Sequence, residues 1–437
     1  MLEDMNTIVI ISAFGRGHWL AVELQRSGLS VCLVDVTEKM GSSVPEDAEG
    51  PFGFFYSEKK KESQLERFLE GDPPQTLPGG FTVWLSDGPL EMKSSLTLHR
   101  LDQLQVAPEV RTAILAGEAD SFKKIQNLPF SKTWLAQIGA SLAANVYFPH
   151  GELLNSKLPL SLFSNYMTIM PTRQGHQKSL DWCRRQGVKV IEKAEVIDFS
   201  FFDRKLVRGI EIRHDRSDLS RLIEGERFVW CLTSEESEML GVKIQDHLYP
   251  EGKLEPEWIW SRFRIKLLPC LEREQLPAHF LMLQDLDRPW THENFTLVIR
   301  TGSPDFFDCW MRISNVQRFN KEHLEFRGQR LIEILKSRLE LSDPQIGEYP
   351  IGYEHTYNQV GPARHPIYNL SKKTRHKVGG FQNIYFDSPE QWDCLGWEGA
   401  FAHQNGIITQ INHWWEAKQA QLRKQKKNQG MNEVNSD

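Results

Sequence analysis

The pattern of apolar and polar positions near the amino terminus predicts a strand, a turn, a helix and a second strand. Residues 7–36 begin with a run of apolar side chains, pass through a turn that contains Gly15, and continue with apolar positions at helical spacing. Gly28 then separates the helix from a second apolar run that ends at Asp35. This order is typical of a βαβ unit, in which a helix joins two parallel strands inside a sheet.

The turn of this unit has the spacing of a dinucleotide-binding motif but lacks two of the three glycines. In the motif G-x-G-x-x-G the first glycine makes a tight turn, the second lets the pyrophosphate approach, and the third lets the helix pack closely on the strand. With Gly17 in the third position, Ser12 takes the first position and Phe14 the second. Asp35 then falls at the end of the second strand, where an acidic residue would bind ribose hydroxyls.

A second register of the motif takes Gly15 and Gly17 as the first two glycines and Leu20 as the third. We favour the first register, because the second puts a bulky residue where helix and strand should touch. In the first register the helix N-terminus still offers N–H groups to an anion, and Arg16 can contact a phosphate. Phe14, however, places a ring where the pyrophosphate would approach. The unit is therefore either a weakened dinucleotide site or a βαβ unit that only builds a sheet.

Later parts of the chain predict the remaining elements. Residues 170–213 and 225–240 predict a helix and three strands, the last of which leads into a Ser/Glu-rich helix start. Residues 255–345 alternate aromatic-rich strands with turns and include an amphipathic helix, a pattern typical of an antiparallel sheet with a helix against it. Residues 379–415 predict a strand, a polar turn and a helix that begins at Trp397.

These elements predict the α/β fold class, with a Rossmann-like domain of the FAD/NAD(P)-binding type that is built from discontinuous segments and carries an inserted α+β domain of the substrate type. We expect a hairpin turn at Asp87-Gly88 and helices within 108–145. The expected domains are residues 1–80, 170–245 and 346–416 for the dinucleotide-binding type, 81–169 and 246–345 for the substrate or cap type, and 417–437 for a flexible tail.

Composition and charge exclude several classes of function. The chain of 437 residues has a net charge of −6, so it has no basic excess to meet a nucleic-acid backbone. No long apolar run predicts a transmembrane segment, and acidic residues before the first apolar stretch argue against a secretory signal. Six cysteines are scattered without metal-ligand spacing, which predicts reduced thiols in a cytoplasmic protein and no metal site. Motifs of serine hydrolases, zinc proteases and P-loop enzymes do not occur.

The order of these blocks resembles the flavoprotein superfamily of amine oxidases, protoporphyrinogen oxidases and phytoene desaturases. The βαβ unit, the Met170-Pro171 turn with the block that follows it, and the helix start at Glu398-Gly399-Ala400 carry the resemblance, over somewhat under half of the chain. The resemblance implies FAD as the cofactor. The positions that would bind it are Ser12, Phe14, Gly15, Arg16, Gly17, Asp35, Val196, Trp397, Glu398, Gly399 and Ala400.

The departures from the superfamily pattern fall on cofactor contacts. Ser12 and Phe14 replace glycines, Met40-Gly41-Ser42 stands in place of a Gly-Gly-Arg type turn, and Ser388-Pro389 replaces a late Gly-Asp pair that Asp387 precedes. Most positions that build the fold are kept. The chain is thus similar to a degenerate member, and the same superfamily includes the Rab GDP-dissociation inhibitors, which use the fold as a binding scaffold.

Two functions follow from the sequence. The first is an FAD-dependent oxidoreductase with a degenerate phosphate-binding loop, which would transfer a hydride between the flavin and an unidentified small-molecule or lipid substrate. The second is a cofactor-free pseudoenzyme that binds a protein or lipid partner. Asp35 and Glu398-Gly399-Ala400 favour the first function, and Phe14 favours the second. No catalytic residue is assigned, because in this superfamily the flavin carries the chemistry.

Overall fold

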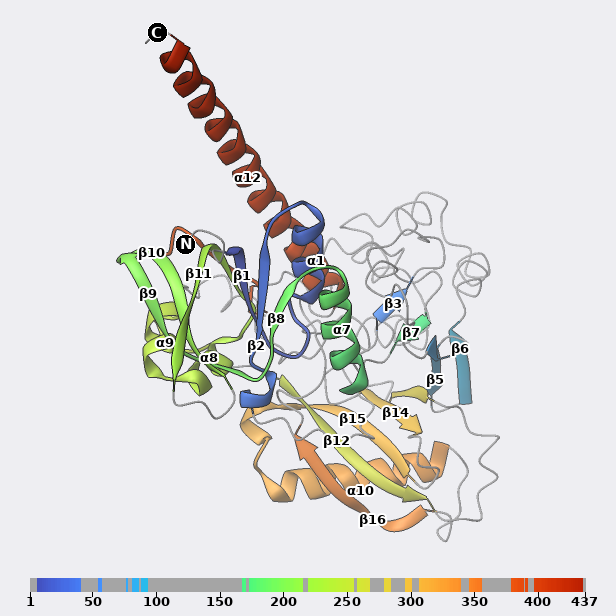
Figure 1. Ribbon diagram of the computed structural model, residues 1–437. Helices are drawn as coiled ribbons and strands as arrows, with labels where there is room; N and C mark the ends of the chain where they lie inside the picture. Colours follow the sequence, from blue (N-terminus) through green and yellow to red (C-terminus); the bar gives the residue numbers. More distant parts are fainter. Residues whose placement is uncertain are drawn as a thin grey trace, which may run out of the picture.

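The computed structural model describes the amino-terminal unit, the middle block and the helix that ends the chain (Figure 1). Met170-Pro171, Gly41-Ser42 and the helices expected within 108–145 lie outside the described residues. The described residues are 6–40, 54–56, 76–77, 81–85, 88–92, 167–169, 173–214, 219–254, 258–267, 279–283, 295–300, 306–338, 346–355, 379–388, 390–391 and 397–434.

A seven-stranded sheet organises the dinucleotide-type domain. Five of its strands are parallel and lie in the order β8-β2-β1-β11-β17, which is third, second, first, fourth and fifth along the chain. This order defines a Rossmann-type sheet. The strands are β1 (Asn6–Ser12), β2 (Val31–Asp35), β8 (Lys189–Ile191), β9 (Ala194–Asp203), β10 (Leu206–His214), β11 (Ser220–Trp230) and β17 (Ile384–Phe386).

The long strand β11 joins the parallel sheet to an antiparallel layer. Its first residues pair with β10, which in turn pairs with β9, whereas its last residues pair with β1 on one side and with β17 on the other. Its side chains change accordingly from exposed at Ser220 to fully buried at Trp230. One strand therefore supplies both layers of the domain.

Helices cover both faces of the parallel sheet, which explains why β1 and β2 are buried along their whole length. Helix α1 (His18–Arg26) contacts both α7 (Arg173–Arg185) and α12 (Trp397–Val434). Figure 1 shows these three helices on one side of the sheet, with β9, β10 and the short helices α8 (Ser234–Leu240) and α9 (Val242–Leu248) on the other.

The second domain contains another seven-stranded sheet, in the order β16-β12-β15-β14-β13-β5-β6. The strands predicted within 255–345 and the amphipathic helix are present as β12 to β15 and α10. Strands β5 and β6 pair antiparallel with Leu85 opposite Gly88, as the predicted hairpin requires, whereas Asp87 lies outside the described residues. The elements are β5 (Phe81–Leu85), β6 (Gly88–Met92), β12 (Trp258–Leu267), β13 (His279–Leu283), β14 (Phe295–Arg300), β15 (Phe306–Ser314), α10 (Lys321–Arg338) and β16 (Ile346–His355).

The structure differs from the predicted segment boundaries at two places. Strand β16 was expected in the dinucleotide-type segment 346–416, but it pairs with β12 of the second sheet. The chain from residue 417 was expected to be a flexible tail, but helix α12 continues without interruption to Val434. Strands β3 (Phe54–Tyr56) and β4 (Thr76–Leu77) pair with β7 (Met167–Ile169) in a small third sheet.

Gly17 allows a close approach of helix α1 to the sheet. Replacing it should therefore lower the unfolding free energy by more than its positive φ alone explains. A Cβ atom at Gly17 would lie 2.7 Å from Sγ of Cys231 and 3.0 Å from Cγ2 of Ile10, and φ is +79°. Gly28 has a similar φ of +84° but open space around a Cβ atom, so it is a matched control. We expect Gly28→Ala to lower the unfolding free energy by about 1–2 kcal/mol and Gly17→Ala by a further 1–3 kcal/mol or so. Urea unfolding followed by circular dichroism measures both, and equal losses would contradict the close contact.

Candidate functional site

The strand register brings the candidate dinucleotide residues to one edge of the sheet. Ser12 pairs with Asp35, so the last residues of β1 and β2 lie side by side. Trp230 ends β11 beside them, and its carbonyl accepts a hydrogen bond from the backbone N–H of Asp387, which follows β17 (N···O 2.8 Å). This is the carboxyl edge of the parallel strands, where ligands bind in open α/β sheets.

The turn between β1 and α1 has the geometry of the favoured register. Gly17 caps the N-terminus of α1 in the left-handed conformation and makes the close helix–strand contact expected of a third glycine. Phe14 and Gly15 also have positive φ angles, of 56° and 80°. Ser12 manages the tight turn without positive φ, and its hydroxyl donates to the carbonyl of Arg16 (O···O 2.6 Å). The second position therefore has a glycine-like backbone that carries a phenylalanine side chain.

Thr37 binds both groups that a dinucleotide would need. Its hydroxyl oxygen accepts a hydrogen bond from the backbone N–H of Phe14 (2.9 Å) and donates to Oδ2 of Asp35 (3.1 Å). Its backbone N–H donates to Oδ1 of the same carboxylate (3.2 Å). One residue thus links the phosphate-type turn to the acidic residue at the end of β2.

Asp35 is also enclosed by the first residue of helix α1. The side chain of Asp35 is buried, and Nε2 of the fully buried His18 lies 3.9 Å from its Oδ2. Nδ1 of His18 forms a hydrogen bond with the hydroxyl of Ser179 in α7 (2.7 Å). The carboxylate that would bind ribose hydroxyls therefore lies inside a set of contacts that hold α1, α7 and β2 together.

Arg16 forms a buried ion pair with Glu236 of helix α8. Both side chains are at most 2% exposed. The guanidinium lies 5.6 Å from the centre of the Phe14 ring, and this ring is part of the hydrophobic core. Arg16, which the sequence offered as a phosphate contact, is thus directed to a carboxylate of the protein.

A second buried carboxyl group lies next to this ion pair. Glu390 accepts hydrogen bonds from the backbone N–H (2.9 Å) and the hydroxyl of Ser234 at the start of α8, and from the hydroxyl of Ser388 (3.4 Å). Burial raises the pKa of Glu390 from 4.5 to about 7, and the Glu236 charge adds to this rise while the hydrogen bonds from the two serines oppose it. Glu390 therefore holds a proton more tightly in the folded protein than in the unfolded chain.

The charge of this edge does not suit a pyrophosphate. Arg16 brings one positive charge, whereas Asp35, Glu236 and Asp387 bring carboxylates that are all at most 3% exposed. In a buried environment such carboxylates repel an anion strongly. The N–H of Phe14 and the oxygens of Asp35 are bonded within the chain. The described residues therefore do not fit FAD in the way that the resemblance implies.

The remaining predicted residues lie apart from this turn or outside the described side chains. Val196 is fully buried in β9, in the same hydrophobic core as Phe14. Trp397, Glu398, Gly399 and Ala400 form the first turn of α12, but their side chains lie outside the described part of the structure. One turn further along, Gln404 donates to Oδ2 of Asp387 (2.6 Å), which docks this helix at the carboxyl edge.

Sequence reasoning missed Thr37, Glu236 and Glu390. Thr37 follows Asp35 by two positions, and an Asp or Thr side chain often bonds the backbone two residues away, so a local signal existed. Glu236 lies three residues after the N-cap residue Thr233 and forms a capping box with it. The pattern Thr-x-x-Glu in the sequence predicts such a capping box. Its pairing with Arg16, 220 positions earlier, has no signal in a single sequence.

Solved structures share this fold over nearly the whole chain. An oxidoreductase from Methanosarcina mazei is 14% identical with a TM-score of 0.54, and the match covers 93% of this chain and 100% of that one. Putrescine oxidase with bound putrescine is 13% identical with a TM-score of 0.51, covering 95% and 99%. No protein-family model and no curated protein matches the sequence. The predicted fold is confirmed: the chain has the fold of these oxidoreductases.

Among the residues that the structure describes, no cluster of three or more His, Cys, Asp or Glu side chains is arranged to hold a metal ion. In the same part of the chain, no helix combines the length and apolar character that crossing a bilayer requires.

Glu390 should make the stability of the protein depend on pH. Because its pKa is higher in the folded state, its stabilising effect is complete below pH 4.5 and is lost as the pH rises through about 7. We expect the unfolding free energy to fall over this range by on the order of 3 kcal/mol from this group. Glu390→Gln keeps the acceptor for Ser234 and should flatten this part of the profile. The measurement is urea unfolding at several pH values.

The exposed Glu238 of the same helix α8, which pairs with Lys253 (2.8 Å), provides the control. Glu238→Gln should keep the pH profile of the wild type. A profile that stays equally steep in Glu390→Gln would show that another group causes it.

Proposed function

We propose that this protein is a pseudoenzyme with the fold of flavin-dependent oxidoreductases, a degenerate phosphate-binding loop and no flavin chemistry, and that it serves as a binding scaffold for a protein or lipid partner. The observation that carries this proposal is the double contact of Thr37, which binds the N–H of Phe14 and the carboxylate of Asp35 at once. An FAD molecule in the usual position would compete with both contacts.

Three further features support the proposal. The core position of the Phe14 ring makes the loop part of the hydrophobic interior. The ion pair of Arg16 with Glu236 removes the cation nearest to the turn. Separating this buried pair to admit a phosphate would leave Glu236 buried without its partner, which typically costs several kcal/mol.

An FAD-dependent oxidoreductase is the second candidate, and the fold favours it. The chain shares its fold over more than nine-tenths of its length with an oxidoreductase and with putrescine oxidase. The carboxyl edge keeps Asp35 at the end of β2 and the helix contact of Gly17. If this candidate holds, a flavin would supply the hydride chemistry, and the chain would supply binding and orientation for a small-molecule substrate.

The absorption spectrum of the freshly purified protein, followed by titration with FAD, separates the two candidates. The scaffold proposal predicts a colourless protein that takes up no added FAD. Flavin bands or micromolar uptake would overturn it, and Asp35→Ala should then weaken the uptake because it removes acceptors for ribose hydroxyls. A colourless protein leads to a pull-down and a lipid-overlay assay for the partner.

If the side chains of Ser12, Phe14 and Thr37 prevent flavin binding, removing them should create affinity for FAD. We expect Ser12→Gly with Phe14→Gly to give measurable FAD binding, seen as quenching of flavin fluorescence, and Thr37→Ala added to this pair to strengthen it. Phe14→Gly suits the backbone at residue 14, because φ there is 56° and glycine adopts a positive φ readily. Ser12→Gly with Phe14→Leu keeps a bulky side chain and is the control. A folded triple variant without flavin affinity would show that the steric account is wrong.

A further inference from the structure

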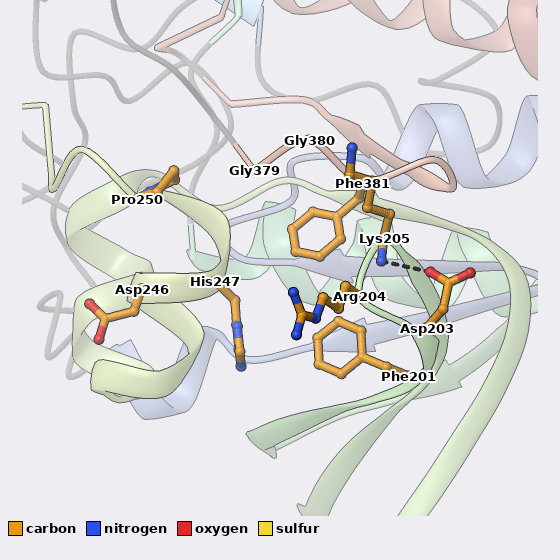
Figure 2. A pocket seen from close by; sticks show the side chains of 10 residues that line it. All are labelled: Phe201, Asp203, Arg204, Lys205, Asp246, His247, Pro250, Gly379, Gly380 and Phe381. Atoms are coloured by element: carbon orange, nitrogen blue, oxygen red, sulfur yellow. Dashed lines mark hydrogen bonds between the residues drawn. The ribbon is translucent and has the colours of Figure 1, made fainter.

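A separate cavity of about 630 Å³ lies in the dinucleotide-type domain, away from the Ser12–Gly17 turn. Three segments line it: residues 201–205 around the β9–β10 turn, residues 246–250 at the end of α9, and residues 379–381 (Figure 2). Residues 379–381 precede β17, whereas Asp387 follows it. Because β17 is parallel to β1, the cavity and the dinucleotide-type turn lie at opposite edges of the sheet.

Aromatic rings form one wall of this cavity. Phe201 and Phe381 are half-buried and stack on each other, with ring centres 6.2 Å apart and planes inclined by 18°. The ring of His247 meets Phe201 edge-on at 5.3 Å. Phe199 lies behind both phenylalanines, at 6.0 Å from Phe201 and 6.4 Å from Phe381, and connects them to the core. Both phenylalanine rings line the cavity, and the face of either ring can stack on an aromatic ring of a ligand.

Two cations line the cavity beside these rings. Figure 2 shows the Arg204 guanidinium directed towards His247 and the phenylalanine rings, and Lys205 extending past Phe381. Within the described residues, no carboxylate pairs with either side chain, whereas the neighbouring Arg208, Lys243 and Lys253 each have one.

The two acidic residues of the lining, Asp203 and Asp246, do not pair with Arg204 or with the ammonium group of Lys205. Asp203 accepts a hydrogen bond from the backbone N–H of Lys205 (2.7 Å) and so holds the β9–β10 turn. The carboxylate of Asp246 points away from the rings in Figure 2. The lining of the cavity therefore combines half-buried apolar rings with exposed positive charge.

Gly379 and Gly380 line the third side of the cavity with backbone only, because neither has a side chain. A Cβ atom at Gly379 would lie 2.5 Å from the carbonyl oxygen of His247, so the backbone passes directly over the end of α9. A Cβ atom at Gly380 would meet nothing within 4 Å, and Gly380 lines the cavity. A side chain can thus be added at Gly380 without a clash in the fold.

We propose that this cavity binds a small anionic aromatic compound, such as an aryl carboxylate, sulfonate or phosphate. Its ring would stack on the face of Phe201 or of Phe381, and its anionic group would bind the guanidinium of Arg204 with support from Lys205. The cavity volume lies within the range of small-molecule sites. This proposal does not depend on whether flavin binds, because none of the cavity's residues belongs to the carboxyl edge of the sheet.

The test is a fluorescence titration of the full chain with anilinonaphthalene sulfonate, which is itself an anionic aromatic compound. We expect Gly380→Leu to abolish one binding site by filling the cavity, and Arg204→Gln to weaken that site about tenfold by removing a charge-assisted contact. N-phenylnaphthylamine, the uncharged analogue, should bind the wild type more weakly and be insensitive to Arg204→Gln.

Matched variants control for general effects of each change. Gly406→Leu places the same side chain at another glycine with open space, in helix α12, and Arg208→Gln removes a charge from the outer face of β10. Both should titrate like the wild type, and circular dichroism should confirm that every variant is folded. Equal binding by Gly380→Leu and the wild type would overturn the site. Equal affinity for the charged and uncharged dyes would overturn its preference for anions.

Discussion

The close approach of helix α1 to the parallel sheet at Gly17 is the constraint on which the rest of the domain depends. At this point a Cβ atom would lie only 2.7 Å from Sγ of Cys231, so only a glycine lets the helix begin there without a clash. The next residue, His18, is then placed to bond Ser179 and approach Asp35, and the preceding residue, Arg16, is placed to meet Glu236. One backbone contact thus connects the first βαβ unit to α7 and α8.

At the carboxyl edge of the sheet, polar groups that would bind a ligand are hydrogen-bonded to other groups of the chain. Buried polar groups need partners, and here the N–H of Phe14, the carboxylate of Asp35 and the guanidinium of Arg16 find partners within the chain. The hydroxyl of Thr37 bonds the N–H of Phe14 and the carboxylate of Asp35, while Glu236 accepts a hydrogen bond from Arg16. A ligand at this edge must replace these bonds with better ones, which is a stricter requirement than finding an open cleft.

The two edges of the same sheet therefore differ in character. At the carboxyl edge, polar side chains are buried and paired, and carboxylates outnumber the one cation of the turn. At the opposite edge, the 379–381 segment and the β9–β10 turn leave an aromatic cavity with cations beside it. The fold supplies both edges, but the side chains decide which of them is open to a ligand.

The sequence by itself determined the βαβ unit, its register, the strands and helix of the second domain, and the fold. These depend on periodicity and on local glycines such as Gly17, and both are local properties. The tertiary structure alone decided the partners of Arg16 and Glu390, the membership of β16 in the second sheet, and the aromatic cavity. Those features join residues that are far apart in the chain, and no pattern within one element specifies which distant side chain completes a buried pair.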